Sequence, residues 1–113
     1  MEQFAPIALF VYNRLSHTKE TIEALKKNTL ANQSELYIFS DGAKNNPADR
    51  ENVHQVRRYI ASVSGFQTIH IIKKEKNAGL SRSIISGVRS LIEKYGKVIV
   101  IEDDLVSSPV FLS

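Results

Sequence analysis

Apolar residues fall into four short runs, separated by longer segments in which the apolar positions have helical spacing. The runs are rich in β-branched and aromatic residues, which is typical of buried strands. The last run has four β-branched residues in a row, the pattern of a strand buried on both faces. The runs predict strands over Ile7–Tyr12, Leu36–Phe39, Thr68–Ile72 and Val98–Ile101.

The segments between the runs predict three amphipathic helices. The first is expected to begin near Ser16, a residue type that caps helix N-termini well, and to turn Ile22 and Leu25 toward the core. The second follows Asn45–Pro47 and is expected to end at Gly65. The third is expected to stop at Gly96, after an apolar stripe made of Leu80, Ile84, Val88, Leu91, Ile92 and Tyr95.

Strands that alternate with helices at this spacing predict an α/β domain with three layers (α/β/α) and a mainly parallel, Rossmann-like sheet. Two strand orders fit the pattern. In the order 3-2-1-4, the first and fourth strands are neighbours, and a ligand would bind where their carboxyl ends meet. In the flavodoxin-like order 2-1-3-4, that crevice lies between the first and third strands instead. The pattern alone does not choose between the two orders.

Composition narrows the function classes. The 113 residues form a single domain, residues 1–113, with a net charge of +3 and no cysteine. A chain without cysteine has no disulfide and no thiolate metal site, and this composition fits a protein of a reducing compartment. No apolar run approaches the roughly 20 residues of a membrane span, and no secretory signal is evident. We therefore expect a cytoplasmic location, with peripheral contact at a membrane face as an alternative for a longer parent protein.

Nucleic-acid binding is not favoured, because the positive charge is modest and spread along the chain. The turn after the first strand has no glycine, so the pyrophosphate turn of dinucleotide-binding proteins is absent. The phosphate loop of P-loop proteins is absent as well. The three histidines are isolated in the sequence: His70 is expected to be a hydrogen-bonded structural residue, His54 lies on a polar helix face, and His17 stands alone.

Three carboxylates, Glu102, Asp103 and Asp104, follow the last apolar run directly. Their mutual repulsion is costly unless a cation or hydrogen-bond donors compensate it. Alternation along an extended chain would place Glu102 and Asp104 on one side and Asp103 on the other. This split suits a site that holds a hard divalent cation together with a polyol, although an acidic loop exposed to water is an equally simple interpretation.

The order of four motifs resembles the nucleotide-binding half of GT-A glycosyltransferases, namely family 2 enzymes and the N-acetylglucosaminyltransferase I group. The resemblance extends from about Pro6 to Phe111 and implies the strand order 3-2-1-4. The motifs are Tyr-Asn-Arg at residues 12–14, Ser-Asp-Gly at 40–42, Asn-Ala-Gly-Leu-Ser at 77–81 and Glu-Asp-Asp-Leu at 102–105. The last motif is followed by Pro109 and Phe111, as it is in the second group.

The resemblance implies a role for each carboxylate of the triplet. Asp104 would bind Mn²⁺ or Mg²⁺, which bridges the diphosphate of a nucleotide sugar. Hard cations prefer such oxygen ligands and often bind through one protein carboxylate plus substrate phosphates. Asp103 and Glu102 would contact hydroxyl groups of the ribose or of the donor sugar.

The other motifs would form the nucleotide pocket. Asp41 would recognise the base, commonly uracil, although an Asp-Gly turn explains it as well. Asn13 and Arg14 would line the pocket. Gly79 allows close backbone approach, and free amides at the next helix N-terminus, with Arg82, could face a phosphate. The family often has an Arg-Asn pair where this chain has Ile84–Ile85, which weakens the case for Arg82.

The resemblance thus implies a glycosyltransferase donor-binding domain, with UDP-sugar as the expected donor and a carbohydrate or glycolipid hydroxyl as the acceptor. Transfer is expected to be inverting. The chain is expected to be part of a longer glycosyltransferase whose catalytic base follows Ser113, so this chain alone is expected to be inactive. Two alternatives remain: a sugar nucleotidyltransferase, which usually has a Gly-rich loop after the first strand, and a non-catalytic module of the flavodoxin or receiver type.

Overall fold

A computed structural model describes residues 4–28 and 31–102, and these form an α/β domain with a parallel sheet of four strands. The strands are β1 (Ile7–Val11), β2 (Glu35–Ser40), β3 (Thr68–Lys73) and β4 (Ile99–Glu102). Their order is β3-β2-β1-β4, which confirms the predicted order 3-2-1-4 and excludes the flavodoxin-like order.

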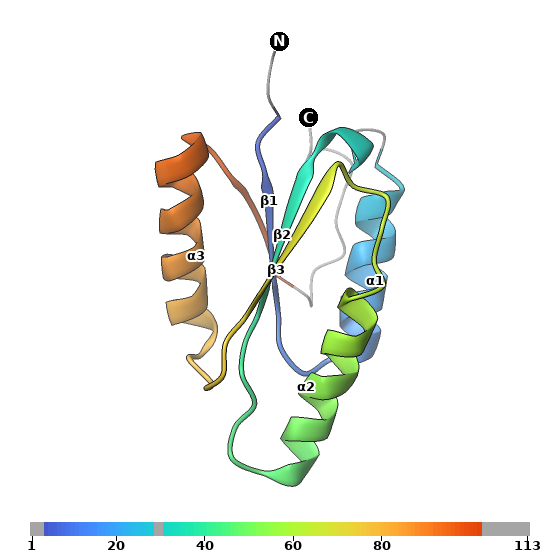
Figure 1. Cartoon of the computed structure of the whole chain (residues 1–113), viewed down its shortest axis with the longest axis vertical. Coiled ribbons are helices and arrows are strands. Elements are labelled where there is room, and N and C mark those ends of the chain that lie inside the picture. The colour runs from blue at the N-terminus through green and yellow to red at the C-terminus, as the bar shows by residue number, and fades with distance from the viewer. Residues whose placement is uncertain (1–3, 29–30, 103–113) are drawn as a thin grey trace.

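Three α-helices connect the strands: α1 (Leu15–Lys26), α2 (Pro47–Ile60) and α3 (Leu80–Tyr95). A short 3₁₀ helix, η1 (Ala31–Gln33), precedes β2. Figure 1 shows the three layers edge-on, with α3 covering one face of the sheet and α1 and α2 covering the other. This is the three-layer arrangement that the alternating pattern predicts.

The core has one part on each face of the sheet. All five residues of β1 are buried, because this strand lies between β2 and β4 and is covered on both faces. Successive side chains of a strand point to opposite faces of the sheet, so neighbouring residues of β1 belong to different parts of the core. The larger part lies under α1 and α2 and is centred on Ile7, Leu9, Ile22, Leu36 and Ile38. The smaller part lies under α3 and is built from Ala8, Phe10, Tyr37 and Leu91.

Two helix boundaries differ from the prediction. α1 begins at Leu15, and Arg14, not Ser16, occupies its N-cap position without any side-chain cap hydrogen bond. α2 ends at Ile60, so Gly65 lies beyond the helix that it was expected to terminate. The prediction for α3 is confirmed, since Gly96 adopts the left-handed conformation at its C-cap with a φ of 78°.

The fourth strand is not buried on both faces, contrary to the prediction from its β-branched run. β4 is an edge strand, with Ile101 buried and Val100 41% exposed. The stripe on α3 is also buried only in part, because Leu80 is 49% and Ile92 is 43% exposed. A run of β-branched residues therefore indicates a strand without showing that both of its faces are covered.

His70 has the structural role that its position in a strand predicts. Its ring stacks on Tyr37, with the ring centroids 4.2 Å apart, and its Nε2 lies 3.3 Å from a carboxylate oxygen of Glu35. The Tyr37 hydroxyl lies 2.5 Å from that of Tyr95 and connects this group to α3. His54 is exposed on α2, as expected.

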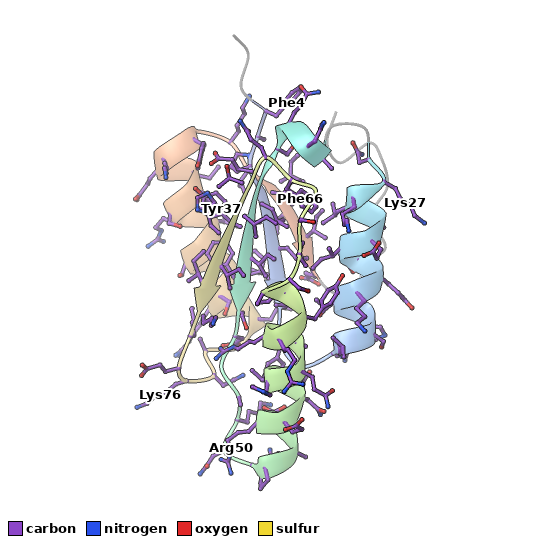
Figure 2. The ribbon with its side chains drawn as sticks, turned by 45° about the vertical axis from the view of Figure 1, so that its right-hand side comes forward. Phe4, Lys27, Tyr37, Arg50, Phe66 and Lys76 are labelled. Carbon is purple, nitrogen blue, oxygen red and sulfur yellow. The ribbon has the colours of Figure 1, made fainter. Side chains whose placement is uncertain are left out.

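All four strands run in the same direction, so their carboxyl ends meet at one end of the domain. Figure 2 shows Arg50, in the first turns of α2, and Lys76, between β3 and α3, at this end, whereas Phe4 and Phe66 lie toward the opposite end. Within the described residues, no helix is both long and apolar enough to span a membrane.

Candidate functional site

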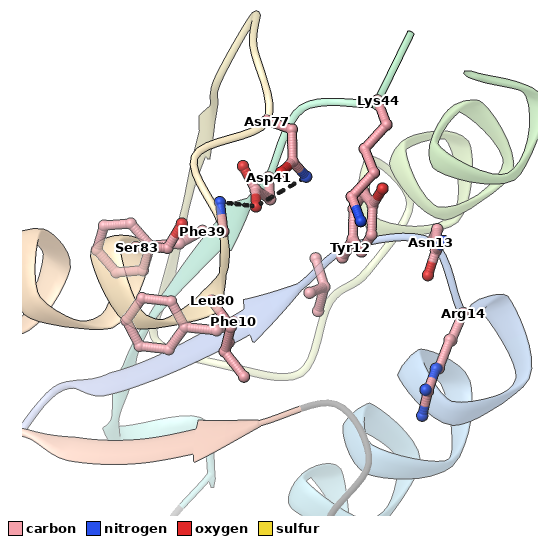
Figure 3. A pocket seen from close by; sticks show the side chains of 12 residues that line it. Phe10, Tyr12, Asn13, Arg14, Phe39, Asp41, Lys44, Asn77, Leu80 and Ser83 are labelled. Atoms are coloured by element: carbon pink, nitrogen blue, oxygen red, sulfur yellow. Dashed lines mark hydrogen bonds between the residues drawn. The ribbon is translucent and has the colours of Figure 1, made fainter. Parts of the chain in front are cut away.

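A pocket of about 440 Å³ opens at the carboxyl end of the sheet, a volume within the usual range of small-molecule sites. It lies between the end of β1, the end of β2 and the first turn of α3 (Figure 3). Open α/β sheets bind ligands at this end. The lining residues are Phe10, Val11, Tyr12, Asn13, Arg14, Phe39, Asp41, Lys44, Asn77, Gly79, Leu80 and Ser83.

One end of the pocket has an aromatic wall. The rings of Phe10 and Phe39 stack with centroids 4.9 Å apart and planes 12° apart, because these residues are register partners on β1 and β2. Gly87 lets α3 lie directly against the two rings, since a Cβ on this residue would come within 3.0 Å of Phe10 and 3.1 Å of Phe39. The wall therefore depends on a residue without a side chain.

The carboxylate of Asp41 is fully occupied by hydrogen bonds from the chain itself. Its Oδ1 accepts from the amides of Gly42 and Ala78, both at 2.9 Å. Its Oδ2 accepts from the amide of Gly79 at 3.0 Å and from the side-chain amide of Asn77 at 3.3 Å. Two oxygens of a carboxylate have about four acceptor sites, so this arrangement leaves none of them open to a ligand.

Asp41 thus fills the place where a phosphate was expected. The amides of Ala78 and Gly79, at the N-terminus of α3, are not free, because the Asp41 carboxylate accepts from both. A carboxylate at a helix N-terminus is favourable for the same electrostatic reason as a bound anion. The structure therefore gives Asp41 the task of fixing the loop between β3 and α3, rather than leaving it free to recognise a base.

The two loops beside Asp41 approach each other closely at Gly42. A Cβ on this residue would lie 2.6 Å from the carbonyl carbon of Lys76 and 2.8 Å from its oxygen. The Ser-Asp-Gly motif therefore has a packing reason for its glycine as well as a bonding reason for its aspartate. The side-chain amide of Asn77 also donates to the carbonyl of Gly42, at 3.0 Å.

A second internal acceptor, Asp49, joins the end of β1 to α2. The Tyr12 hydroxyl and the Asn13 side-chain amide both donate to its carboxylate, the latter at 2.7 Å. The amide of Lys44 donates at 2.6 Å. The hydrogen bond from Tyr12 is the main cause that holds the pKa of Asp49 below its ordinary value, while burial and Asp49 together raise the pKa of Tyr12 to about 12. Asn13 lines the pocket, as expected, but its amide already has a partner.

Arg57 of α2 ties together the two strand ends behind the pocket. Its guanidinium donates to Ser40 Oγ at 2.9 Å, to the carbonyl of Lys74 at 2.7 Å and to that of Asp41 at 3.2 Å. It is also 3.3 Å from the carbonyl of Ser40. Through these contacts α2 holds the end of β2, which carries Asp41, against the residues that follow β3.

Two cations lie at the end of the pocket away from the aromatic wall. Arg14 and Lys44 both line the pocket and are exposed, and neither forms an ion pair with another described residue. Figure 3 shows them on the side opposite to Phe10 and Phe39. Arg82, by contrast, is exposed on α3 and is not among the lining residues.

The acidic triplet is only partly visible in the structure. Glu102 is the last residue of β4 and the register partner of Phe10, so it lies beside the aromatic wall without lining the pocket. Asp103 and Asp104 lie outside the described residues. Within residues 4–28 and 31–102, no three His, Asp or Glu side chains gather in a way that could hold a metal ion.

Sequence reasoning missed several residues of the pocket. Lys44 follows a turn and gives no pattern of its own, and Ser83 is a small polar residue inside a helix. Phe10 and Phe39 could have been found, because strand alternation places them on one face at the ends of adjacent strands. Asp49 carries no sequence signal, since its partners Tyr12 and Asn13 are 37 and 36 positions away along the chain.

Comparison with models of known protein families gives no match, and a search of curated proteins gives none either. The functional argument therefore depends on the pocket and on the order of the motifs.

Proposed function

We propose that this chain is the donor-binding domain of a GT-A-type glycosyltransferase and binds a nucleotide-diphosphate sugar, with UDP-sugar as the first candidate. The observation that carries the proposal is that the two ends of the pocket differ in chemistry. Stacked phenylalanine rings form one end and two cations without ion pairs among the described residues form the other, at the carboxyl end of a sheet ordered 3-2-1-4.

Such a pocket suits a ligand that has a flat ring at one end and negative charge at the other. The ring of Phe39 and the side chain of Leu80 offer apolar surface to a nucleobase, whereas Phe10 is only 2% exposed and contributes by stacking on Phe39. Arg14 and Lys44 attract the diphosphate, and the guanidinium of Arg14 can donate two hydrogen bonds to one phosphate group. A nucleoside diphosphate has both features.

The location of the pocket also supports a ligand-binding site. In the order 3-2-1-4, β2 and then β3 are added on one side of β1, and β4 is added on its other side. The order in which the strands are added therefore reverses at β1. Ligands of open α/β sheets bind at such a switch point. Five consecutive pocket residues, Phe10 to Arg14, come from the end of this strand and the turn that follows it.

A divalent cation belongs to the proposal through the acidic triplet. Asp104 would hold Mn²⁺ or Mg²⁺, and carboxylate oxygen is the donor type that these ions prefer. When bound, the ion would neutralise charge on the diphosphate and on the departing nucleotide. Arg14 and Lys44 would also contact the diphosphate, and Glu102 and Asp103 would contact sugar hydroxyl groups. In a longer parent chain, the donor sugar would be transferred to a hydroxyl acceptor, with inversion.

Calorimetric titration with UDP tests the proposal, with and without Mn²⁺, on the wild-type chain and on Asp104→Asn and Arg14→Ala. Arg50→Ala is the matched control, because Arg50 is an exposed arginine at the same end of the domain but outside the pocket. We expect binding that requires Mn²⁺, weakens in Asp104→Asn and weakens by about tenfold in Arg14→Ala, as for loss of a charge-assisted hydrogen bond.

Binding in Arg50→Ala should equal that of the wild type. An absence of heat with UDP, GDP and CDP in the presence of Mn²⁺ would contradict the proposal for this chain and favour a module that binds no nucleotide. Equal losses in Arg14→Ala and Arg50→Ala would show general attraction to positive charge rather than a site.

A further inference from the structure

Ser83 has a buried hydroxyl that no described residue satisfies. The residue is 5% exposed, and its Oγ has no hydrogen-bond partner within residues 4–28 and 31–102. It lies in the first turn of α3 and belongs to the wall of the pocket, on the side of Phe39 and Leu80 (Figure 3). A buried hydroxyl without a partner costs free energy, and a ligand that supplies the partner recovers that cost.

The surroundings of Ser83 favour an uncharged polar group as that partner. The adjacent helix N-terminus is already neutralised by the carboxylate of Asp41, which accepts from the amides of Ala78 and Gly79. A phosphate there would face this buried carboxylate at close range, which is unfavourable. The cations that suit a phosphate, Arg14 and Lys44, line the opposite end of the pocket.

The ring edge of a nucleobase meets these conditions. Its flat face fits against the apolar side chains of Phe39 and Leu80, and its carbonyl or amide groups can exchange a hydrogen bond with a serine hydroxyl, which both donates and accepts. Asp41 cannot take this part, because all of its acceptor sites are filled from within the chain.

We propose that Ser83 is the residue that hydrogen-bonds the base of the bound nucleotide, and that Asp41 acts on the base only by positioning the loop before α3. The base then enters toward α3, and the phosphates lie toward Arg14 and Lys44. This inference deepens the proposed function and depends on it.

The test compares Ser83→Ala with Ser86→Ala, an exposed serine on the same helix, by calorimetric titration with two probes, UDP and inorganic pyrophosphate, in the presence of Mn²⁺. We expect Ser83→Ala to lower the affinity for UDP about three- to tenfold, as for one neutral hydrogen bond, and to leave the affinity for pyrophosphate unchanged. Ser86→Ala should match the wild type with both probes.

Urea unfolding of the same variants supplies a second readout. Because the Ser83 hydroxyl has no internal partner and alanine favours helix, Ser83→Ala should be as stable as the wild type or more stable. A fall in stability together with lower UDP affinity would indicate a structural hydroxyl and overturn the inference. An unchanged affinity for UDP in Ser83→Ala, or an equal loss with both probes, would overturn it as well.

These outcomes are distinct from failure of the proposed function. If the wild-type chain binds no UDP, both proposals fail together. If the wild type binds UDP and Ser83→Ala binds it equally well, the donor site stands and only the role of Ser83 is wrong.

Discussion

Asp41 and Asp49 are acceptors for groups of the chain itself, and this determines which residues of the pocket are available to a ligand. Asp41 holds the loop before α3, and Asp49 holds the end of β1 and the loop before α2. The side chains left for a ligand are those of Phe39 and Leu80, the two cations and the Ser83 hydroxyl. The role of each aspartate can therefore be tested by measuring the stability of variants, independently of any ligand.

Asp41→Asn should lower the free energy of unfolding, by about 1–3 kcal/mol. The amide group of asparagine donates, so two of the four N–H groups from which Asp41 now accepts would lose their acceptor in a buried setting. Urea denaturation measures the change. Glu75→Gln is the matched control, since it removes a negative charge from an exposed position in the adjacent loop, and it should change stability by less than about 0.5 kcal/mol. Equal values for the two variants would show that the Asp41 contacts contribute nothing.

The lowered pKa of Asp49 makes stability depend on acid. The folded chain binds this proton less readily than the unfolded chain, in which the ordinary value of 3.8 applies. The contribution to stability is therefore complete above this value and is lost as the pH falls through the lower folded-state pKa. Tyr12→Phe removes the main cause of the shift, so its urea midpoint should fall less steeply between about pH 4 and pH 2.

If the urea midpoint of Tyr12→Phe fell as steeply with pH as that of the wild type between about pH 4 and pH 2, the role of Tyr12 in lowering the pKa of Asp49 would be contradicted. Glu35, whose pKa is lowered chiefly by its hydrogen bond with Tyr95, contributes a slope of the same sign in both proteins. The comparison between the two proteins, rather than the wild-type curve alone, is therefore the measurement that isolates Asp49.

The sequence predicts single residues of the pocket unevenly. The Tyr-Asn-Arg and Ser-Asp-Gly motifs place Asn13, Arg14 and Asp41 at strand ends, and all three line one pocket because strand ends in a parallel sheet meet. The motifs do not show that Asn13 and Asp41 already have partners, since most of those partners lie 36 to 38 positions away along the chain. Such contacts depend on loop geometry, which the pattern of apolar residues does not encode.

Among the elements, α2 contributes to the site without lining it. The side chain of Arg57, on α2, donates hydrogen bonds to Ser40 and Asp41 at the end of β2 and to the carbonyl of Lys74 after β3. It therefore links the helix to two strand ends. Hydrogen bonds from a charged donor are stronger than neutral ones, and those of Arg57 are half-buried. The position of the Asp41 loop therefore depends on α2.

Arg57→Gln should lower the free energy of unfolding on the order of 3 kcal/mol, because glutamine is too short to reach the carbonyls of Asp41 and Lys74, which then lose this charged donor. Arg58→Gln is the matched control: it is the same substitution at the next residue, where the side chain is exposed. Urea denaturation of the two variants provides the comparison. If they lose equal stability, the contacts of Arg57 do not stabilise the domain.

Element types and order were predictable, because period-two and period-3.6 patterns are distinct in this chain. Boundaries were less so. Ser16 is a good cap by residue type, yet the N-cap position lies two residues earlier, at Arg14, and the helix begins at Leu15. The exposure of Val100 was also missed, because the sequence of a strand does not say whether another element covers it.

At the level of the whole molecule, the strand order decides where the site lies. With β1 between β2 and β4, the aromatic wall, the two cations and the end of β4 are brought to one end of the domain. The cluster of Glu35, Tyr37, His70 and Tyr95 lies instead toward the start of β2 and β3 and the end of α3. The two ends of the domain thus have different chemistry, and a ligand should distinguish between them.

The most direct test of the account is a titration of the ¹⁵N-labelled chain with UDP in the presence of Mg²⁺, followed by the shifts of its backbone amide signals. We predict saturable shifts at Tyr12, Arg14, Lys44, Leu80 and Ser83, and none at Glu35, His70 and Tyr95. Shifts confined to the latter group, or no saturable shift at any amide, would contradict a nucleotide site at the carboxyl end of the sheet.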